Sequence, residues 1–217
     1  MEISGQVLSS DNKEILPYAI IEYKKHQTGV YSDENGLFKI KIDNLNDTLD
    51  ISYVGYEKVQ IPAHKIAQNS KHCILLNKNT YKLNDIIVTK KDVMYLTVGA
   101  TKRKAWSYQA SNIFGSQIGK YIVNPTSGPG FIKSVSFYIA STGFPNAPFR
   151  VRVYSFDKEN KCPGEDLLTE NIVVSSKNKS GWFKVDLLKY SIDFPKEGVF
   201  IVMEWIYSGD QYYYTKE

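Results

Sequence analysis

The sequence contains few of the residues from which metal sites and catalytic centres are usually built. Its 217 residues include two cysteines, Cys73 and Cys162, and three histidines, which all lie in the first half. Neither cysteine has a spacing typical of metal ligands, and the histidines are too scattered for a zinc site or a catalytic triad. Cys73 lies in an apolar, strand-like run, which favours an inert buried thiol. A disulfide to Cys162 would require contact between the two halves of the chain.

Long hydrophobic runs and catalytic motifs are also missing. No stretch reaches the roughly 18–20 apolar residues of a transmembrane helix, so we expect no transmembrane segment. The chain opens with Met1-Glu-Ile-Ser4 and shows no charged and apolar leader typical of a signal peptide. Neither Gly-x-Ser-x-Gly nor a phosphate-binding glycine loop occurs. The sequence therefore predicts no enzyme activity, no cofactor and no metal.

The charge is weak and does not indicate a nucleic acid partner. The formal net charge is +4, without the dense basic stripe and interleaved aromatic residues that nucleic acid binding needs. The tightest basic cluster, Lys102-Arg-Lys104, is more typical of a solvated loop than of a phosphate site.

Aromatic residues and alternating apolar patterns are plentiful instead. The chain contains 16 Tyr and 10 Phe, which are enriched in strands. The first half alternates apolar and polar residues with a period of two between closely spaced turns, and a single helical turn is expected between Pro62 and Gln68. Strands are expected at Ile3–Val7, Ala19–Tyr23, Leu37–Ile42, Leu49–Tyr53, Glu57–Ile61, Cys73–Leu76 and Ile86–Thr89. About seven short strands in under ninety residues favour a β-sandwich.

Two turns of the first half are expected to depend on glycine. In Asp33-Glu-Asn-Gly36, Gly36 can adopt a positive φ while Asp33 hydrogen-bonds its own backbone. Gly55 permits a tight bend beside Tyr56. Asp33 and Glu34 could alternatively hold calcium, but two carboxylates provide fewer than the six or more oxygens that this ion prefers.

Together these segments resemble a known domain family. The resemblance is carried by five segments: Ile3-Ser-Gly-Gln-Val7, Leu16-Pro-Tyr-Ala19, Asp33-Glu-Asn-Gly-Leu-Phe38, Asp47-Thr-Leu-Asp-Ile-Ser-Tyr-Val-Gly-Tyr56 and Leu83-Asn-Asp-Ile-Ile-Val88. They are similar to the carboxypeptidase-regulatory-like domain, a prealbumin-type (transthyretin-like) Greek-key β-sandwich of exported proteins from Gram-negative bacteria.

The resemblance implies an extracytoplasmic place, in the periplasm or at the cell surface, and an export signal that precedes this sequence. It brings no peptidase residues. In TonB-dependent outer-membrane receptors of this kind, the segment that matches Leu83–Val88 leads into a plug and a membrane barrel. Here a second soluble domain is expected to follow, so the transporter role is not carried over.

The second half is also predicted to be all-β. Strands are expected at Gln117–Val123, Phe131–Ile139, Phe149–Phe156, Ile172–Ser175, Gly181–Leu187 and Val199–Ile206. Val93–Val98 is a further candidate. The pattern resembles a jelly-roll sandwich such as occurs in carbohydrate-binding modules. We therefore predict two domains, residues 1–90 and 91–217, with the second cut short at its C-terminus because the chain ends soon after an apolar strand.

One face of the second half combines charged and aromatic side chains. Alternation along Phe149-Arg-Val-Arg-Val-Tyr154 places Arg150, Arg152 and Tyr154 on one side. If the strands are neighbours, Tyr138 and Glu204 join them in a patch that could bind a sugar through aromatic rings and charged hydrogen-bonding groups. The alternative is a cross-strand ion pair between Arg152 and Glu204 on a solvated face.

A second candidate contact region is the poorly patterned loop that holds Trp106 and Tyr108. Trp182 and Trp205, by contrast, lie inside expected strands and are predicted to be core or half-core residues.

Three functions compete on these observations. The leading hypothesis is a non-catalytic, exported binding or spacer protein whose partner is a glycan or another cell-envelope protein. The second is a carbohydrate-binding accessory protein that acts through the second domain. The third is an enzyme with a carboxylate site in the second half, for which Glu204 is the one acid that the pattern suggests.

Overall fold

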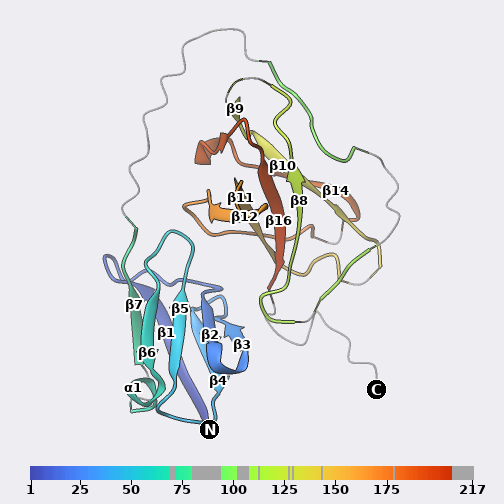
Figure 1. The fold of residues 1–217 in the computed structure, drawn as a ribbon. Helices are drawn as coiled ribbons and strands as arrows, with labels where there is room; N and C mark the ends of the chain where they lie inside the picture. Colours follow the sequence, from blue (N-terminus) through green and yellow to red (C-terminus); the bar gives the residue numbers. More distant parts are fainter. Residues whose placement is uncertain are drawn as a thin grey trace.

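The computed structural model of this chain is built mainly of β-strands. It describes residues 1–68, 72–79, 94–101, 108–111, 113–126, 128, 130–142, 144–177 and 179–206. Within these residues, early strands pair with early strands and late strands with late ones. The described chain therefore divides into an N-terminal unit, residues 1–79, and a C-terminal unit, residues 94–206 (Figure 1). The all-β prediction is confirmed.

The N-terminal unit consists of two sheets. The three-stranded sheet has the order β4 (Leu37–Lys41), β1 (Glu2–Ser9), β7 (His72–Leu76), in which β1 and β7 run parallel. The four-stranded sheet has the antiparallel order β3 (Thr28–Tyr31), β2 (Ile20–Tyr23), β5 (Thr48–Ser52), β6 (Val59–Pro62). The short helices are η1 (Lys24–His26) and α1 (Ala63–Ala67), and α1 confirms the helical turn expected after Pro62.

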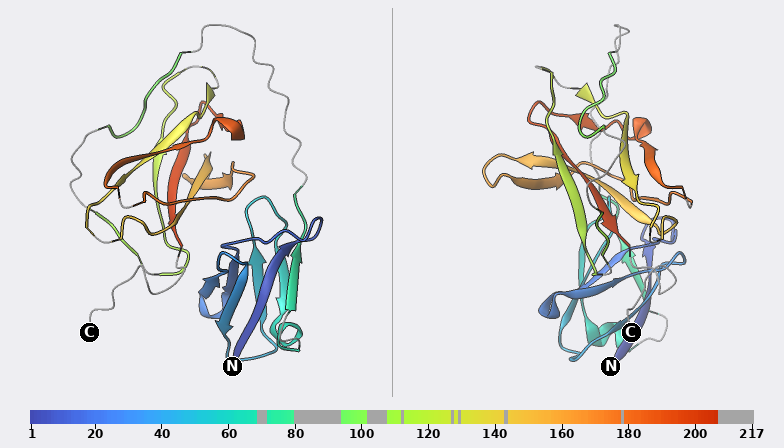
Figure 2. Two further views of the ribbon diagram at one scale, coloured as in Figure 1. Left: turned by 180° about the vertical axis from the view of Figure 1, so that it is seen from behind. Right: turned by 90° about the vertical axis from the view of Figure 1, so that its right-hand side faces the viewer.

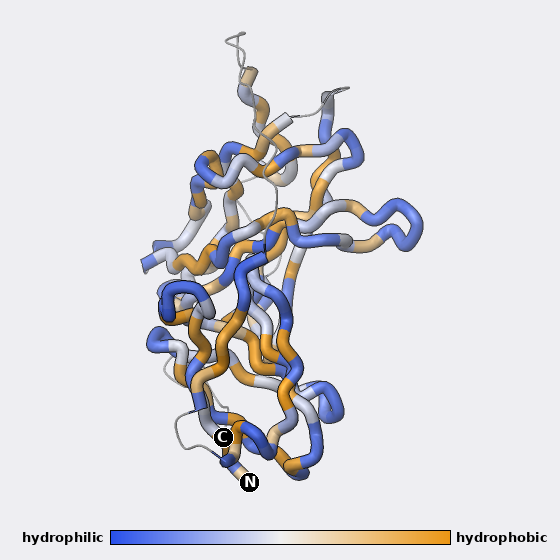
Figure 3. Tube along the Cα trace, turned by 90° about the vertical axis from the view of Figure 1, so that its left-hand side faces the viewer, coloured by the Kyte–Doolittle hydropathy of each residue, from blue (hydrophilic) through white to orange (hydrophobic). Residues whose placement is uncertain are grey.

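Alternation along the strands produces the core between these two sheets. Along β1, Ile3, Gly5 and Val7 are buried, while Ser4 and Gln6 are half-buried on the outer face. The two apolar side chains, Ile3 and Val7, share one hydrophobic cluster with Ile21 of β2 and Ile51 of β5, each fully buried. Burying each such side chain contributes about 1.5–3 kcal/mol. Figure 3 shows the resulting pattern, with hydrophobic stretches along the strands and hydrophilic connections at their ends.

The two glycine turns have the backbone geometry that the sequence predicts. Gly36 has a φ of +69° and Gly55 a φ of +80°, both in the left-handed region. Asp33 closes its own turn, because its Oδ1 accepts hydrogen bonds from Asn35 N and Leu37 N, each at 2.8 Å. This carboxylate thus serves the turn.

Replacing Gly36 with valine is expected to lower the free energy of unfolding by at least about 1 kcal/mol. A β-carbon at Gly36 would lie 2.8 Å from Val7 O, and the positive φ adds backbone strain. Thermal denaturation measures the effect. Gly130→Val is the matched control, since a β-carbon at Gly130 would meet no atom within 4 Å. Equal melting temperatures for the two variants would show that the turn is misread.

The C-terminal unit contains one larger sheet and two smaller ones. In the larger sheet the antiparallel order is β12 (Cys162–Asp166), β11 (Phe149–Asp157), β16 (Val199–Trp205), β8 (Gln117–Ile122), and β13 (Ile172–Val174) also pairs with β11. The smaller sheets pair β10 (Ser134–Ile139) with β14 (Gly181–Asp186), and β9 (Gly130–Phe131) with β15 (Asp193–Phe194). A 3-10 helix, η2 (Leu188–Tyr190), precedes β15.

The core of the C-terminal unit lies between β10–β14 and the larger sheet. Val135 of β10 and Val185 of β14 belong to the same hydrophobic cluster as Val151 and Val153 of β11. The residues of β11 that face this core are Phe149, Val151 and Val153, and Arg150 lies between them on the opposite face of the sheet, as period-two patterning predicts. The jelly-roll identity of this unit stays a prediction.

Several strands differ from the sequence predictions. β3 was not predicted, because Gly29 interrupts its pattern. β12 was not predicted either, since it contains Pro163 and Gly164. It is an edge strand, where a proline costs no internal hydrogen bond, and the register of β11 shifts beside it. Residues 94–98 form no strand, and Met94 and Tyr95 are exposed.

Other predictions concern the cysteines and the segments outside the described residues. Cys73 is exposed, because the neighbouring Ile74 faces the core and Cys73 lies opposite Gln6 on the outer face of its sheet. The structure contains no disulfide between Cys73 and Cys162. The predicted domain boundary at residues 90 and 91, the strand at Ile86–Thr89 and the candidate Trp106 lie outside the described residues.

Candidate functional site

The charged face predicted in the second half exists, with one exception. Arg150, Arg152 and Tyr154 project from the same side of β11, and Arg150 lies directly opposite Glu204 of β16. Tyr138 does not belong to this face, because its strand β10 pairs with β14 in another sheet. The error has a simple cause: alternation predicts the face of a strand but not its neighbours.

Four charged side chains of this face form a network, here called the charge network: Arg150, Arg152, Asp166 and Glu204. Arg150 Nη1 lies 2.7 Å from Glu204 Oε1, and Arg152 Nε lies 2.9 Å from Glu204 Oε2. Arg152 Nη1 also lies 2.6 Å from Asp166 Oδ2. Two cations and two carboxylates are thus joined, and their formal charges cancel.

The centre of the charge network is shielded from water. Arg150 and Glu204 are each 1% exposed. Their remaining hydrogen-bonding groups have partners: Arg150 Nε donates to Asn171 Oδ1 at 2.6 Å, and Gln117 Nε2 donates to Glu204 Oε2 at 3.2 Å. Such pairing is required, because a buried charge without partners costs several kcal/mol. The predicted Arg152–Glu204 ion pair therefore exists, but not on a solvated face.

The N-terminal unit covers the charge network. Tyr31 Oη of β3 donates to Glu204 Oε1 at 3.1 Å, and Arg150 Nη2 donates to the carbonyl oxygen of Tyr18. Asn171 Nδ2 donates to Pro17 O at 3.2 Å. We call this contact between the two units the seam; in the views of Figure 2 it lies where the blue-to-teal strands meet one end of the C-terminal unit.

Apolar and backbone contacts complete the seam. The ring of Tyr31 packs on Phe114 with centroids 5.1 Å apart, and Gly29 leaves room for that Phe114 ring. Val54 of the N-terminal unit is buried in the hydrophobic cluster of the C-terminal unit. The adjacent Gly55 lies so close to the backbone of Thr169 that a β-carbon would collide with its carbonyl oxygen.

Electrostatics favour the protonation states that this geometry requires. Burial raises the pKa of the Tyr31 hydroxyl and the negative charge of Glu204 raises it further, so Tyr31 stays a neutral donor. Burial lowers the pKa of Arg150, while Glu204 opposes this effect. For Arg152 burial acts in the same direction, but Glu204 and Asp166 outweigh it and its pKa is raised. Both guanidinium groups therefore remain charged.

The other candidate residues lie away from the seam or at its border. Tyr154 is half-buried beside the charge network, and its hydroxyl accepts a hydrogen bond from Gln117 Nε2 at 3.2 Å. Tyr108 is 58% exposed. Tyr138 packs edge-to-face on Trp182, with ring centroids 5.4 Å apart. Trp182 is exposed rather than part of the core, whereas Trp205 is half-buried.

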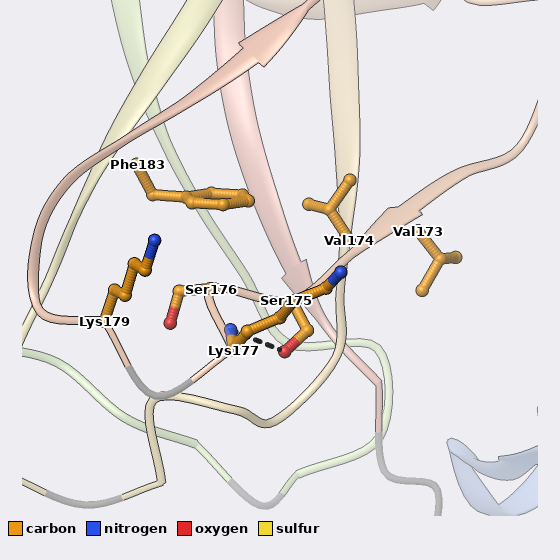
Figure 4. A pocket seen from close by; sticks show the side chains of 7 residues that line it. All are labelled: Val173, Val174, Ser175, Ser176, Lys177, Lys179 and Phe183. Atoms are coloured by element: carbon orange, nitrogen blue, oxygen red, sulfur yellow. Dashed lines mark hydrogen bonds between the residues drawn. The ribbon is translucent and has the colours of Figure 1, made fainter.

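An open pocket of about 510 Å³ lies beside β13 and β14 (Figure 4). Val174, Ser175, Ser176 and Phe183 are among its lining residues. Both serine hydroxyls are already used, because Ser175 Oγ donates to Asn146 O at 2.7 Å and Ser176 Oγ donates to the carbonyl oxygen of Pro145. Lys177 and Lys179 also line the pocket, and Lys177 N donates to Ser175 Oγ at 3.2 Å.

The part of the chain that the structure describes contains neither a metal-binding cluster nor a membrane-spanning helix. Within the described ranges, no group of three or more His, Cys, Asp or Glu side chains is arranged to hold a metal ion. The helices that the structure describes are all too short and too polar for a bilayer crossing.

Comparison with known proteins identifies the N-terminal unit. Residues 3–88 match the family model of the CarboxypepD_reg-like domain. This part of the chain is therefore a CarboxypepD_reg-like domain. The resemblance found in the sequence is confirmed for this part of the chain.

The chain is also similar to TonB-dependent receptor P3 of Formosa agariphila. The two sequences are 24% identical over 153 residues, which is 70% of this chain and 14% of the receptor. The chain thus spans a small fraction of the receptor's length. The 153 aligned residues are more than residues 3–88 can contain. The similarity to the receptor therefore extends beyond the CarboxypepD_reg-like domain.

The CarboxypepD_reg-like domain supplies the seam residues that sequence reasoning missed. Tyr31 is separated from Glu204 by 173 positions, and the backbone carbonyls of Pro17 and Tyr18 carry no side-chain signal. In the C-terminal unit, Asp166 was missed because it lies in β12, a strand that was not predicted. In the CarboxypepD_reg-like domain, the one sequence feature that could have predicted the strand Thr28–Tyr31 is its ending in Val30 and the aromatic Tyr31.

Proposed function

We propose that this chain is a non-catalytic spacer or binding module of the cell envelope of a Gram-negative bacterium. In this module the seam holds the CarboxypepD_reg-like domain and the C-terminal unit in one fixed orientation. The similarity to a TonB-dependent receptor supports a place in the envelope, in the periplasm or at the cell surface. The expected partner is another envelope protein or a glycan.

The observation that carries this proposal is the buried ion pair between Arg150 and Glu204. Tyr31 of the opposite unit donates a hydrogen bond to this pair. Buried ion pairs add little net stability, but breaking one is costly, so they favour a single arrangement of the groups around them. If the units separated, Arg150 and Tyr31 would each lose hydrogen-bond partners. A fixed orientation is what a spacer requires.

The same geometry argues against catalysis by Glu204, the acid that the third hypothesis depends on. Both of its oxygens accept hydrogen bonds from guanidinium groups, and Tyr31 and Gln117 donate to it as well. A general base needs a free oxygen within reach of a substrate proton. Glu204 is better suited to hold the seam.

Cell fractionation tests the proposed location. Antibodies raised against the chain should detect it in the envelope fractions of the bacterium that encodes it, and added protease should reach it once the outer membrane is permeabilised. Detection in the cytosolic fraction alone would contradict the proposal. A cytosolic protein of known location provides the control for lysis.

Carbohydrate binding by the C-terminal unit is the second candidate function. It is favoured by the exposed Trp182, which is 42% accessible beside Tyr138. Of the residues proposed from the sequence, Arg150 and Glu204 are sealed in the seam. Tyr108 is the exposed aromatic candidate, Tyr138 is half-buried beside Trp182, and Arg152 and Tyr154 are half-buried at the border of the seam.

A further inference from the structure

The two-stranded sheet β10–β14 has one buried face and one outer face. Val135 and Val185 point into the core, so the alternate residues of both strands lie on the opposite side. Across this outer face the strands place three pairs directly opposite each other: Tyr138 and Trp182, Ser136 and Lys184, and Ser134 and Asp186.

The aromatic pair of this face is fixed in place but not covered. The rings of Tyr138 and Trp182 meet at 84° with centroids 5.4 Å apart, a favourable edge-to-face arrangement. A cross-strand pair of this kind stabilises a sheet by about 0.2–1 kcal/mol, which accounts for the contact between the rings. It does not account for the exposure of 42% of Trp182, since a large aromatic side chain is usually well buried.

The polar residues beside the rings indicate what could cover them. Ser136, Lys184 and Asp186 are exposed on the same face. Among the described residues Lys184 makes no ion pair, and Asp186 uses its Oδ1 to accept a hydrogen bond from Leu188 N at 2.9 Å. Hydroxyl, ammonium and carboxylate groups next to aromatic rings match a sugar, whose C–H surface packs on a ring and whose hydroxyls both donate and accept hydrogen bonds.

The size and charge of the patch narrow the ligand further. Two rings surrounded by polar residues are too small for the apolar centre of a protein interface, which typically buries about 800 Å² on each partner. Lys184 and Asp186 carry opposite charges, so the face has no net charge to attract an acidic polymer. We propose that the outer face of β10–β14 binds a neutral polysaccharide, with Trp182 as the main stacking residue and Lys184 as a hydrogen-bond donor. This inference rests on the second candidate function.

Isothermal titration calorimetry with a soluble β-glucan and a galactomannan tests the site, and alginate serves as the acidic comparison. A single stacking face should give a Kd of roughly 0.01–1 mM. Trp182→Ala should weaken binding at least about tenfold, and Lys184→Ala by a smaller factor. Phe131→Ala is the matched control, because Phe131 is an aromatic residue of β9 that is 52% exposed. Circular dichroism shows whether each variant folds. If Trp182→Ala does not fold, Lys184→Ala still tests the site, because Lys184 is exposed.

Binding of a neutral polysaccharide that falls in Trp182→Ala and stays unchanged in Phe131→Ala would support the site. Failure of the neutral polymers to bind, binding of alginate alone, or equal binding by the wild type and Trp182→Ala would overturn it. Loss of binding in Tyr108→Ala with Trp182→Ala unaffected would overturn it too, by moving the contact to the loop. None of these outcomes changes the seam, so the spacer proposal is tested separately.

Discussion

Glu204→Gln is expected to lower the free energy of unfolding by about 3–5 kcal/mol, because it leaves the guanidinium of Arg150 buried without its counter-charge. Domains of ordinary size have about 5–15 kcal/mol in total, so this is the largest single loss that we predict. Chemical denaturation of the whole chain, followed by circular dichroism, provides the measurement.

Two further variants show whether burial is the reason. Lys158→Ala removes an exposed ion pair of 2.8 Å with Glu197, and it should cost much less stability than Glu204→Gln because solvent screens the pair. Arg150→Met combined with Glu204→Leu removes both buried charges and should cost less than Glu204→Gln alone. Losses of equal size for Glu204→Gln and Lys158→Ala would contradict the assignment of a buried network.

Gly55→Val is expected to have the second largest effect, because it acts on the seam. A β-carbon at Gly55 would collide with the carbonyl oxygen of Thr169 in the C-terminal unit, and the φ of +80° adds strain of about 1–3 kcal/mol. The variant should therefore separate the two units. Calorimetry should show two transitions where the wild type shows one, and small-angle scattering should show a larger radius of gyration.

Gly36→Val is the matched control for this effect. Its added side chain would collide with Val7 of the same unit, so it should destabilise the N-terminal unit without opening the seam. A single transition and an unchanged radius of gyration in Gly55→Val would show that the Gly55–Thr169 contact does not hold the units together.

Local features of the fold could be predicted from the sequence. The positive φ at Gly36 and Gly55 follows from turn chemistry, and the strand at Phe149–Phe156 follows from alternation. The same alternation correctly predicts that Arg150 and Arg152 project from one face. These features depend on residues close together in the chain, where propensity and pattern are informative.

The burial of that face could not be predicted. It depends on Tyr31, which contacts Glu204 although the two residues are 173 positions apart in the sequence. Tyr31 lies in a strand that was not predicted, because Gly29 interrupts its pattern. The placement of Tyr138 failed for a related reason, because alternation does not determine which strands are neighbours. A polar and aromatic face that resembles a ligand site is, at Arg150 and Glu204, a contact between two parts of one chain.

Tyr31 and Glu204 are expected to be energetically coupled across the seam, and a double-mutant cycle tests this coupling most directly. Tyr31→Phe, Glu204→Gln and the double variant are compared with the wild type by chemical denaturation. Residues that share a hydrogen bond typically show coupling of about 0.5–3 kcal/mol. We predict coupling in this range, with the double variant losing less stability than the sum of the single losses. Strictly additive losses of stability would contradict an energetic contact between Tyr31 and Glu204 across the seam.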